Sequence, residues 1–412
     1  MSIVTDKRLS LLVICLMIIS AATALPDKIL GRNLFYLVIA LVVFIVATNL
    51  KRNNLQKENN VLAVAFLCVG FSQLFWVYRF PGAVDSIYMA DMNYPRTAVY
   101  LLLAALLILF LPWLSSGLQL TKKTRFWVTF LAFSGFVYMC ARGLSYSFTH
   151  PGERLRIDSA ATLSAYLCTL QSLFTLYVIR VMGCKYKALL SILLSCLTML
   201  VILLTQTRSA LILFPLLLLL FVLINRFWSL KLTAGGCLIL GGILFLVVST
   251  SFPGVIDRMH KSYYEITEYS THNSTSFGSR ISMWKAGLYV TTLHPEGQSA
   301  DTRYHEIDAY MKDYEQGNPE GIRNAVYHLH NDIIESLSLQ GLLGGASLLF
   351  LFLSLVYFFY KKDVLYLALP LFIAPIVLFG MVDSLFINDR FTVMLCMQLC
   401  FFAITADISK RR

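Results

Sequence analysis

The stretch that decides the fold is HLHNDIIESLSLQGLLG, residues His328–Gly344. It closes the long polar segment of the chain and runs directly into an apolar segment. Its first half is crowded with polar residues and its second half with apolar ones. Helical spacing would place Ile334, Leu337 and Gly341 on one face, so the stretch predicts a helix that lies on or enters a membrane. A histidine at such a position would stand at the edge of the bilayer, with its ring available for chemistry.

The composition of the chain excludes a soluble protein. Of its 412 residues, 58% are hydrophobic and 14% are charged, and apolar runs that can cross about 30 Å of hydrocarbon recur along its length. The net charge of +11 could indicate nucleic-acid binding. However, the basic residues are scattered in small groups between apolar runs, which is typical of topology signals that face the cytoplasm. The nine cysteines lie in or beside apolar runs and form no CxxC pair, so we expect them to pack rather than to bind metal.

Apolar segments alternate with polar loops, which predicts an all-α integral membrane protein with about twelve transmembrane helices. The first segment could instead be a cleaved signal peptide, because Ala22-Thr23-Ala24 resembles a cleavage site, but the many later spans favour a retained helix. Residues 1–250 would hold nine spans, 251–338 one long outer loop, and 339–412 three more spans. The predicted spans are residues 9–25, 34–49, 61–78, 97–115, 126–141, 159–180, 187–205, 209–225, 232–250, 340–359, 364–382 and 391–406. Helices predicted near 281–293, 302–315 and 326–339 would make the long loop a helical cap on the membrane bundle.

The positive-inside rule orients this chain. With the N-terminus in the cytoplasm, the cytoplasmic segments carry about twice as many Lys and Arg residues as the short loops on the other side. Residues 251–338 then lie outside, on the periplasmic face of the inner membrane of a Gram-negative cell, together with all seven histidines. Because the periplasm lacks ATP and nucleotide sugars, group transfer there needs an activated donor carried by lipid.

Two arginines are candidate anion-binding residues. Arg208 lies between two apolar spans with almost no loop, where a cation is costly and usually pairs or lines a polar cavity. Its planar guanidinium suits phosphate oxygens; the alternative is an arginine that fixes topology at a helix end, although the periplasmic end is the wrong side for that role. Arg280 follows Gly278-Ser279, which predicts a helix start with Ser279 as N-cap. An anion bound there would remove the conflict between Arg280 and the helix dipole, whereas the alternative is an ordinary surface arginine.

His330 is the candidate general base, because histidine titrates near neutral pH. His328 and His330 could alternatively bind a metal with Asp332, or His330 could be a surface histidine. Residues two apart point to different faces of a helix, and the chain has neither an HExxH nor a DxD-type pattern, so we predict no metal site. Asp383, at the outer end of the eleventh predicted span, could orient His330, balance the arginines, or simply end a helix.

Three motifs occur in order along the chain. They are Thr207-Arg208-Ser209-Ala210, then Gly278-Ser279-Arg280 followed by Trp284 and Ala286, then His330-Asn331-Asp332 followed by Gly341-Leu342-Leu343-Gly344. With the twelve-span layout and the long outer loop before the tenth span, this set resembles the O-antigen ligase family of lipopolysaccharide biosynthesis. Each motif alone is weak, whereas the ordered set in this topology is specific. The wider superfamily also contains O-antigen polymerases and protein O-oligosaccharyltransferases, with similar arginines and a similar histidine loop.

The resemblance implies a GT-C-like membrane fold and a metal-independent, inverting glycosyltransferase that uses no cofactor. The donor would be an undecaprenyl-diphosphate-linked O-antigen glycan, and the acceptor a sugar hydroxyl of the lipid A–core oligosaccharide. Carried over by motif, Arg208 and Arg280 hold the diphosphate and His330 acts at the acceptor hydroxyl. Asp383 is carried over as a further substrate-binding residue, in a looser surrounding pattern.

Two other functions fit part of this pattern. An O-antigen polymerase would use the same donor chemistry with a second lipid-linked glycan as acceptor, but polymerases more often divide their periplasmic mass between two sizeable loops. A transporter or flippase of lipid-linked glycan would line its path with the buried arginine. Discontinuous helices in matched halves would favour it, and the sequence shows no such symmetry.

Overall fold

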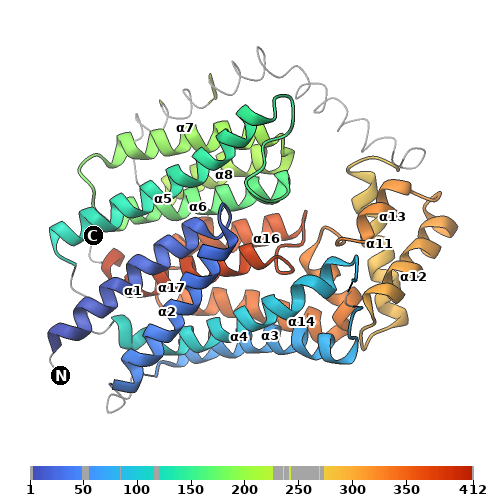
Figure 1. The fold of residues 1–412 in the computed structure, drawn as a ribbon, viewed down its shortest axis with the longest axis horizontal. Helices are drawn as coiled ribbons and strands as arrows, with labels where there is room; N and C mark the ends of the chain where they lie inside the picture. The colour runs from blue at the N-terminus through green and yellow to red at the C-terminus, as the bar shows by residue number, and fades with distance from the viewer. Residues whose placement is uncertain are drawn as a thin grey trace.

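The computed structural model describes residues 3–48, 55–83, 85–115, 120–225 and 273–410, together with the isolated residues 235, 241, 242 and 269. Within these residues the protein is helical and contains no β-strand (Figure 1). The predicted ninth span, 232–250, and the start of the predicted outer loop, 251–272, lie almost wholly outside the described residues. The helices are α1 (Ile3–Thr23), α2 (Lys28–Thr48), α3 (Lys57–Arg79), α4 (Met89–Ser115), α5 (Lys122–Thr149), α6 (Ala161–Met182), α7 (Lys187–Thr205), α8 (Arg208–Asn225), α11 (Gly278–Leu293), α12 (Ala300–Tyr314), α13 (Pro319–Ala325), α14 (Asp332–Lys361), α15 (Leu365–Ala368), η1 (Leu369–Ile373), α16 (Ala374–Gly380) and α17 (Asp389–Lys410).

Seven of the described helices are long and apolar enough to cross a membrane, namely α2, α3, α4, α5, α6, α7 and α14. Three further apolar segments are shorter: Arg8–Thr23, Arg208–Ile224 and Leu365–Gly380. All of these segments, and also α17, overlap predicted spans. The prediction of an all-α membrane protein is therefore confirmed. Seven helices that meet both criteria within the described residues do not establish the predicted number of twelve.

The membrane helices pack into one bundle, in which α6 contacts α5, α7, α8 and α17 and is buried along almost its whole length. The helix α17 in turn contacts α1, α2 and α4. The outer helices also carry large apolar side chains on their exposed faces, such as Phe71 on α3 and Leu353 on α14. Helices that are apolar on both faces suit a lipid surrounding. Inside the bundle, hydroxyl groups bond to the helix backbone, as when Thr169 Oγ1 donates to the Ala165 carbonyl at 2.9 Å.

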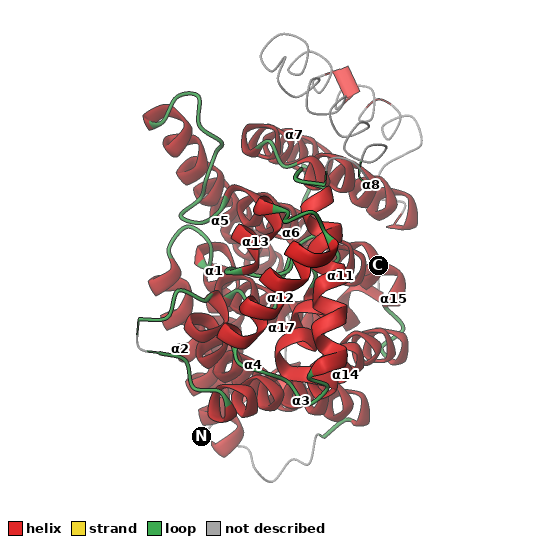
Figure 2. Cartoon of the chain, turned by 90° about the vertical axis from the view of Figure 1, so that its right-hand side faces the viewer, coloured by secondary structure: helices red, strands yellow, loops and turns green. Residues whose placement is uncertain are grey.

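The helices α11, α12 and α13 form a small unit at one end of the bundle (Figure 2). This unit has its own apolar cluster, separate from that of the bundle, with buried members Met283, Ala286, Val290, Ile307, Met311, Ala325, Leu329 and Ile334. The start of α1 and the end of α17 lie at the opposite end of the bundle (Figure 1). The chain therefore places its two ends far from this unit.

Two of the three helices predicted in the outer loop are confirmed as α11 and α12. The third, predicted over residues 326–339, is confirmed only from Asp332 onward, where it forms the start of α14; before it the chain forms the short helix α13, which ends at Ala325. The start of α13 is fixed locally: Pro319 occupies the first turn, and the Asn318 side chain accepts the Gly321 N–H at 2.9 Å. Residues 326–331 are not helical, and α14 begins only at Asp332.

The long helix α14 has a kink at Gly341, where φ is 67° and ψ is −159°. This region of backbone conformation is essentially restricted to glycine. A Cβ at Gly341 would also lie 2.3 Å from the Pro295 carbonyl oxygen. The loop between α11 and α12 makes hydrogen bonds with backbone groups of α14 on either side of this kink. Leu342 N–H donates to Pro295 O at 2.8 Å, and Gln298 N–H donates to Leu339 O at 2.9 Å. The kink thus anchors the outer helical unit on a membrane helix.

This anchoring predicts that Gly341→Ala destabilises the protein more than a matched glycine change. Gly317 has almost the same φ, 68°, but a Cβ there would meet nothing within 4 Å. Both variants place a Cβ at positive φ, and Gly341→Ala alone adds a φ/ψ combination essentially restricted to glycine and the clash with Pro295. Thermal unfolding in detergent should show a clearly larger loss for Gly341→Ala. Equal losses would mean that the contact with Pro295 does not hold the unit in place.

Candidate functional site

The loop from 326 to 331, between α13 and α14, carries His328 and His330, the two histidines of the stretch His328–Gly344. Asn331 caps α14, because its Oδ1 accepts the N–H groups of Ile333 and Ile334 at 3.1 and 3.2 Å. His330 just before it has φ 53°, a left-handed conformation that is unusual for a residue with a side chain. The helix predicted to start at His328 therefore starts four residues later, and the histidines lie on a turn rather than on a helix face.

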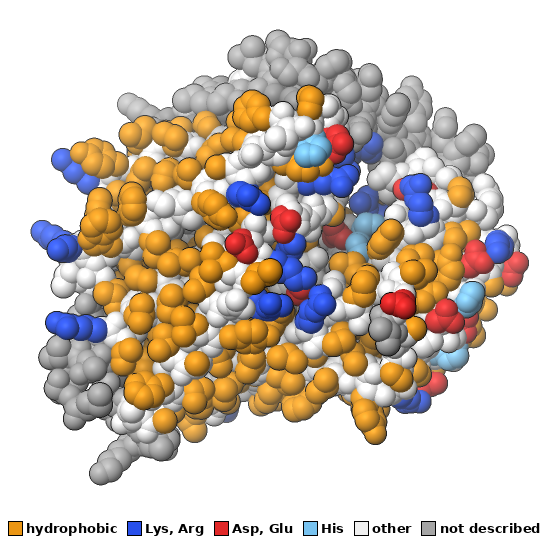
Figure 3. Space-filling model, in the orientation of Figure 1, with side chains coloured by type: hydrophobic (Ala, Val, Ile, Leu, Met, Phe, Trp, Pro, Cys, Tyr) orange, Lys and Arg blue, Asp and Glu red, His pale blue; other side chains and the backbone are white. Residues whose placement is uncertain are grey.

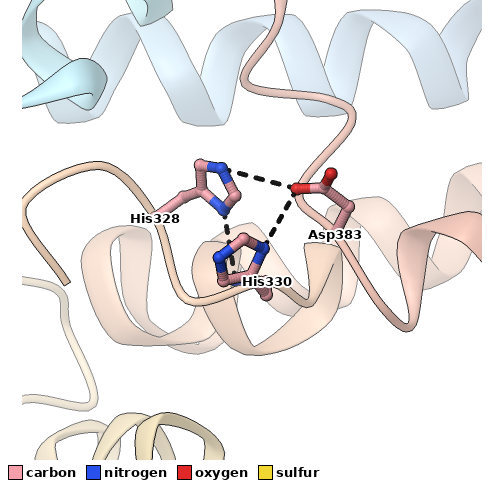
Figure 4. A group of neighbouring side chains, drawn as sticks. All are labelled: His328, His330 and Asp383. Carbon is pink, nitrogen blue, oxygen red and sulfur yellow. Dashed lines mark hydrogen bonds and ion pairs between the residues drawn. The ribbon is translucent and has the colours of Figure 1, made fainter. Parts of the chain in front are cut away.

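This turn brings His328 and His330 together on Asp383, which lies in the loop between α16 and α17 (Figure 4). His328 Nε2 is 3.4 Å and His330 Nδ1 is 3.3 Å from the same carboxylate oxygen, Oδ1. The backbone N–H of His330 donates to His328 Nδ1 at 3.2 Å. Asp383 thus lies in contact with His330, as an orienting role requires, and that role stays a prediction. The predicted substrate-binding role of Asp383 has no such contact behind it, since its near oxygen is engaged by the two histidines.

The hydrogen bonds assign the state of His328. Because its Nδ1 accepts a backbone N–H, that nitrogen carries no proton, and Nε2 carries the proton that points toward Asp383. Burial lowers the pKa of His328 to about 3, and the neighbouring His330 acts in the same direction. His328 is therefore a neutral donor at physiological pH.

Asp383 is a buried carboxylate whose charge is compensated. Burial by itself would raise the pKa of Asp383, but His328 and His330 hold it well below its ordinary value. The positive charge of Arg280 acts in the same direction. Asp383 is consequently ionised, and it can stabilise a positive charge that develops on a histidine beside it.

Two contacts tie the histidine loop to the Asp383 loop. Asn331 N–H donates to Ser384 Oγ at 3.2 Å, and Asp332 Oδ1 accepts the Phe386 N–H at 2.9 Å. Gly380 leaves room for this approach, since a Cβ there would lie 2.4 Å from Asp332 Oδ2. Asp332 therefore positions the second loop, and the alternative metal set of His328, His330 and Asp332 is wrong: the carboxylate that joins the histidines is Asp383.

A buried ion pair that the sequence analysis missed supports the same loop. Arg303 on α12 donates from Nη1 to Glu335 Oε1 at 2.6 Å, and Glu335 Oε2 accepts the Leu329 N–H at 2.7 Å. Arg303 also donates from Nη2 to the Ala325 carbonyl at 3.3 Å. Both side chains of the pair are almost fully buried. An acidic residue among apolar ones at the start of a membrane helix was the available signal for this pair.

Arg280 lies in the first turn of α11, as predicted, although the cap differs. Thr275 Oγ1 accepts the Gly278 N–H at 3.0 Å, and Ser279 lies inside the helix, so the prediction of Ser279 as N-cap is wrong. Arg280 donates from Nη1 to the Ser276 carbonyl at 3.1 Å. Its Nε is buried and has no hydrogen-bond acceptor among the described residues. The guanidinium is close enough to act on the charges of both His328 and Asp383.

Arg208 is the first residue of α8, and the next residue, Ser209, connects this helix start to the site. Ser209 Oγ lies 2.7 Å from the hydroxyl of Tyr166 on α6, and Tyr166 is close enough to experience the charges of Asp383 and Arg280. A third arginine, Arg154, was missed as a site residue; it donates from Nε to the Thr205 carbonyl at 2.9 Å, just before Arg208. The structure thus brings His330 and Asp383 into contact, with Arg280 close enough for its charge to act on Asp383, and places Arg208 at the same end of the bundle.

The space-filling view agrees with this grouping. Charged side chains gather between the largely apolar flank of the bundle and the end that α11–α13 occupy, with histidines among them (Figure 3). Among the described residues, His328, His330 and Asp383 each offer one ligand atom, all within 4.8 Å of one another, and form a group that could hold a metal ion. The positive charge of Arg280 at the same place disfavours a divalent cation and favours an anion.

Comparison with known proteins agrees with the motifs. Residues 190–349, which include Arg208, Arg280 and His330, match the model of a protein family described as "O-Antigen ligase". The chain is also similar to the O-antigen ligase of Escherichia coli (strain K12), with 27% identity over 322 residues, which is 76% of this chain and 74% of that protein. Residues 190–349 of this membrane protein are thus similar to the O-antigen ligase family, which is the family that the three motifs indicated.

Proposed function

We propose that the chain is an O-antigen ligase. It transfers an undecaprenyl-diphosphate-linked glycan to a sugar hydroxyl of lipid A–core, at the periplasmic face of the inner membrane. The observation that carries this proposal is His330 held by Asp383 next to Arg280. A base, a carboxylate that orients it and a cation beside the leaving group are the parts that such a transfer needs.

His330 is the general base of the proposed reaction. We place the proton of the neutral ring on Nδ1, which lies 3.3 Å from Asp383 Oδ1, so that Nε2 is the acceptor. The acceptor oxygen forms a bond to the anomeric carbon, and its proton passes to His330 Nε2. The bond between the anomeric carbon and the phosphate oxygen breaks, and its electron pair leaves with the diphosphate. Attack in line with the leaving group inverts the anomeric configuration, and Asp383 stabilises the imidazolium that forms.

Arg208 and Arg280 hold the diphosphate in this proposal. Each lies in the first turn of a helix, α8 and α11, where the helix dipole also favours an anion. The buried Nε of Arg280 is a donor that a phosphate oxygen would satisfy. Two guanidinium groups can stabilise the developing charge of the leaving group without a metal, which makes the enzyme a metal-independent glycosyltransferase of the GT-C type.

The orientation of the site follows from the charge pattern. The site lies at the end of the bundle that α11–α13 occupy, whereas the start of α1 and the end of α17 lie at the other end (Figure 1). Lys and Arg side chains also appear at that other end (Figure 3). The positive-inside rule then places both chain ends in the cytoplasm and the site in the periplasm.

We expect substitutions of the two arginines and of His330 to impair glycan transfer in different ways. Arg208→Ala and Arg280→Ala should lower single-turnover transfer by about 10²–10³-fold, with a smaller loss of donor affinity, because their contacts strengthen as charge develops on the leaving group. Arg280→Lys should recover only part of the rate, since lysine lacks the planar fork. His330→Ala should leave donor binding nearly unchanged and lower transfer by about 10²–10⁴-fold.

The measurements are donor binding and single-turnover transfer with purified protein, at matched protein levels. Arg323→Ala is the matched control, because Arg323 is an exposed arginine of α13 whose partner is Glu320. Transfer by His330→Ala at the normal rate would show that His330 is not the base.

We also predict that transfer needs no divalent metal. Purified protein should keep its activity in EDTA, because the arginines supply the positive charge at the leaving group. If EDTA abolishes transfer and Mg²⁺ or Mn²⁺ restores it, then His328, His330 and Asp383 are metal ligands and the base must be sought elsewhere.

A further inference from the structure

His328 belongs to none of the three sequence motifs, yet it contacts the same oxygen as His330. Asp383 Oδ1 faces His328 Nε2 at 3.4 Å, His330 Nδ1 at 3.3 Å, and the Ser384 N–H at 2.9 Å. The side chain of His328 is only 16% exposed. The two imidazole rings meet edge to face, with centroids 4.3 Å apart (Figure 4). A buried ring whose Nε2 lies 3.4 Å from the orienting carboxylate limits how that carboxylate can rotate.

The groups around His328 restrict its side chain to one role, that of a hydrogen-bond donor facing Asp383. Its Nδ1 accepts the His330 N–H, so its Nε2–H is its free donor, and Asp383 is the acceptor in front of it. The other charged and titratable groups that face this cluster are Arg280 of α11, Arg303 of α12, Asp332 and Glu335 of α14, and Tyr166 of α6. The two arginines oppose a positive charge on His328, so this ring serves as a neutral donor rather than as a second base.

We propose that His328 is a positioning residue for the transfer reaction: its Nε2–H fixes the carboxylate of Asp383 in the orientation in which that carboxylate serves His330. The proposal rests on the proposed role of His330 as general base. His328 shares the negative charge of one oxygen with His330. Loss of the His328 donor therefore leaves more of that charge to His330, makes protonation of the base easier, and moves the acid limb of the rate profile to higher pH.

Two substitutions separate the contacts of His328. In His328→Gln the side-chain amide nitrogen takes the place of Nε2 and keeps the donor to Asp383, but the acceptor for the His330 N–H is lost. In His328→Asn the amide oxygen takes the place of Nδ1 and keeps that acceptor, but the donor to Asp383 is lost. We expect His328→Gln to transfer within about threefold of the wild-type rate with an unchanged acid limb. For His328→Asn we expect kcat to fall by about tenfold or more, an unchanged KM for the donor, and an acid limb shifted up by ~0.5–1 pH unit.

The experiment is the pH dependence of kcat and KM for purified wild type, His328→Gln, His328→Asn and His330→Ala, with thermal unfolding recorded for each. His294→Gln is the matched control, because His294 Nε2 makes a similar contact with Glu306, at 2.6 Å and at the other end of α11 from Arg280. Wild-type behaviour of both His328 variants, or the same loss in both, would overturn the proposal, as would a loss that only follows reduced stability. Wild-type transfer by His330→Ala would instead refute the proposed function, whatever the His328 variants do.

Discussion

The structure of the site depends on one buried carboxylate, that of Asp383. Placing an ionised carboxylate away from water is costly unless donors and positive charge surround it. Here two imidazole rings, a backbone N–H and the charge of Arg280 provide this compensation. The arrangement gives the carboxylate one stable orientation, and that orientation makes His330 a base with a defined acceptor nitrogen. The chemistry and the local stability thus depend on the same contacts.

The rest of the fold holds the histidine loop, residues 326–331, next to the loop that carries Asp383. Asp332 holds the backbone of the Asp383 loop, and Glu335 holds the backbone of the histidine loop. Arg303 then connects Glu335 to the outer helical unit, and the kink at Gly341 fixes that unit on α14. The first three turns of one membrane helix therefore carry the cap, the loop anchors and the kink. This explains why polar residues and glycines are interleaved in the sequence from Asn331 to Gly344.

Local signals predicted much of this architecture, and long-range contacts could not be predicted. Hydropathy is a local property, so the boundaries of α7 match the prediction, and α8 begins one residue before the predicted span. The start of α14 was misplaced because apolar periodicity was followed back through His328, although Asn331, a preferred N-cap residue, marks the true start. Asp383 was predicted as a residue of the site. Its contact with both histidines could not be predicted, because it joins residues more than fifty apart in the sequence. The Arg303–Glu335 pair likewise depends on how α12 packs on α14, which no single stretch of sequence encodes.

The most direct test of the account is the lipopolysaccharide profile of a strain that lacks this gene and is complemented with either the wild-type chain or His330→Ala. The wild-type chain should restore O-antigen on lipid A–core. The His330→Ala chain, present at the same level in the membrane, should leave core that bears no O-antigen, because the acceptor hydroxyl is not activated. Core that bears a single O-antigen unit in that strain would contradict the account, since it would show that ligation proceeds without His330 and that the chain extends the glycan instead.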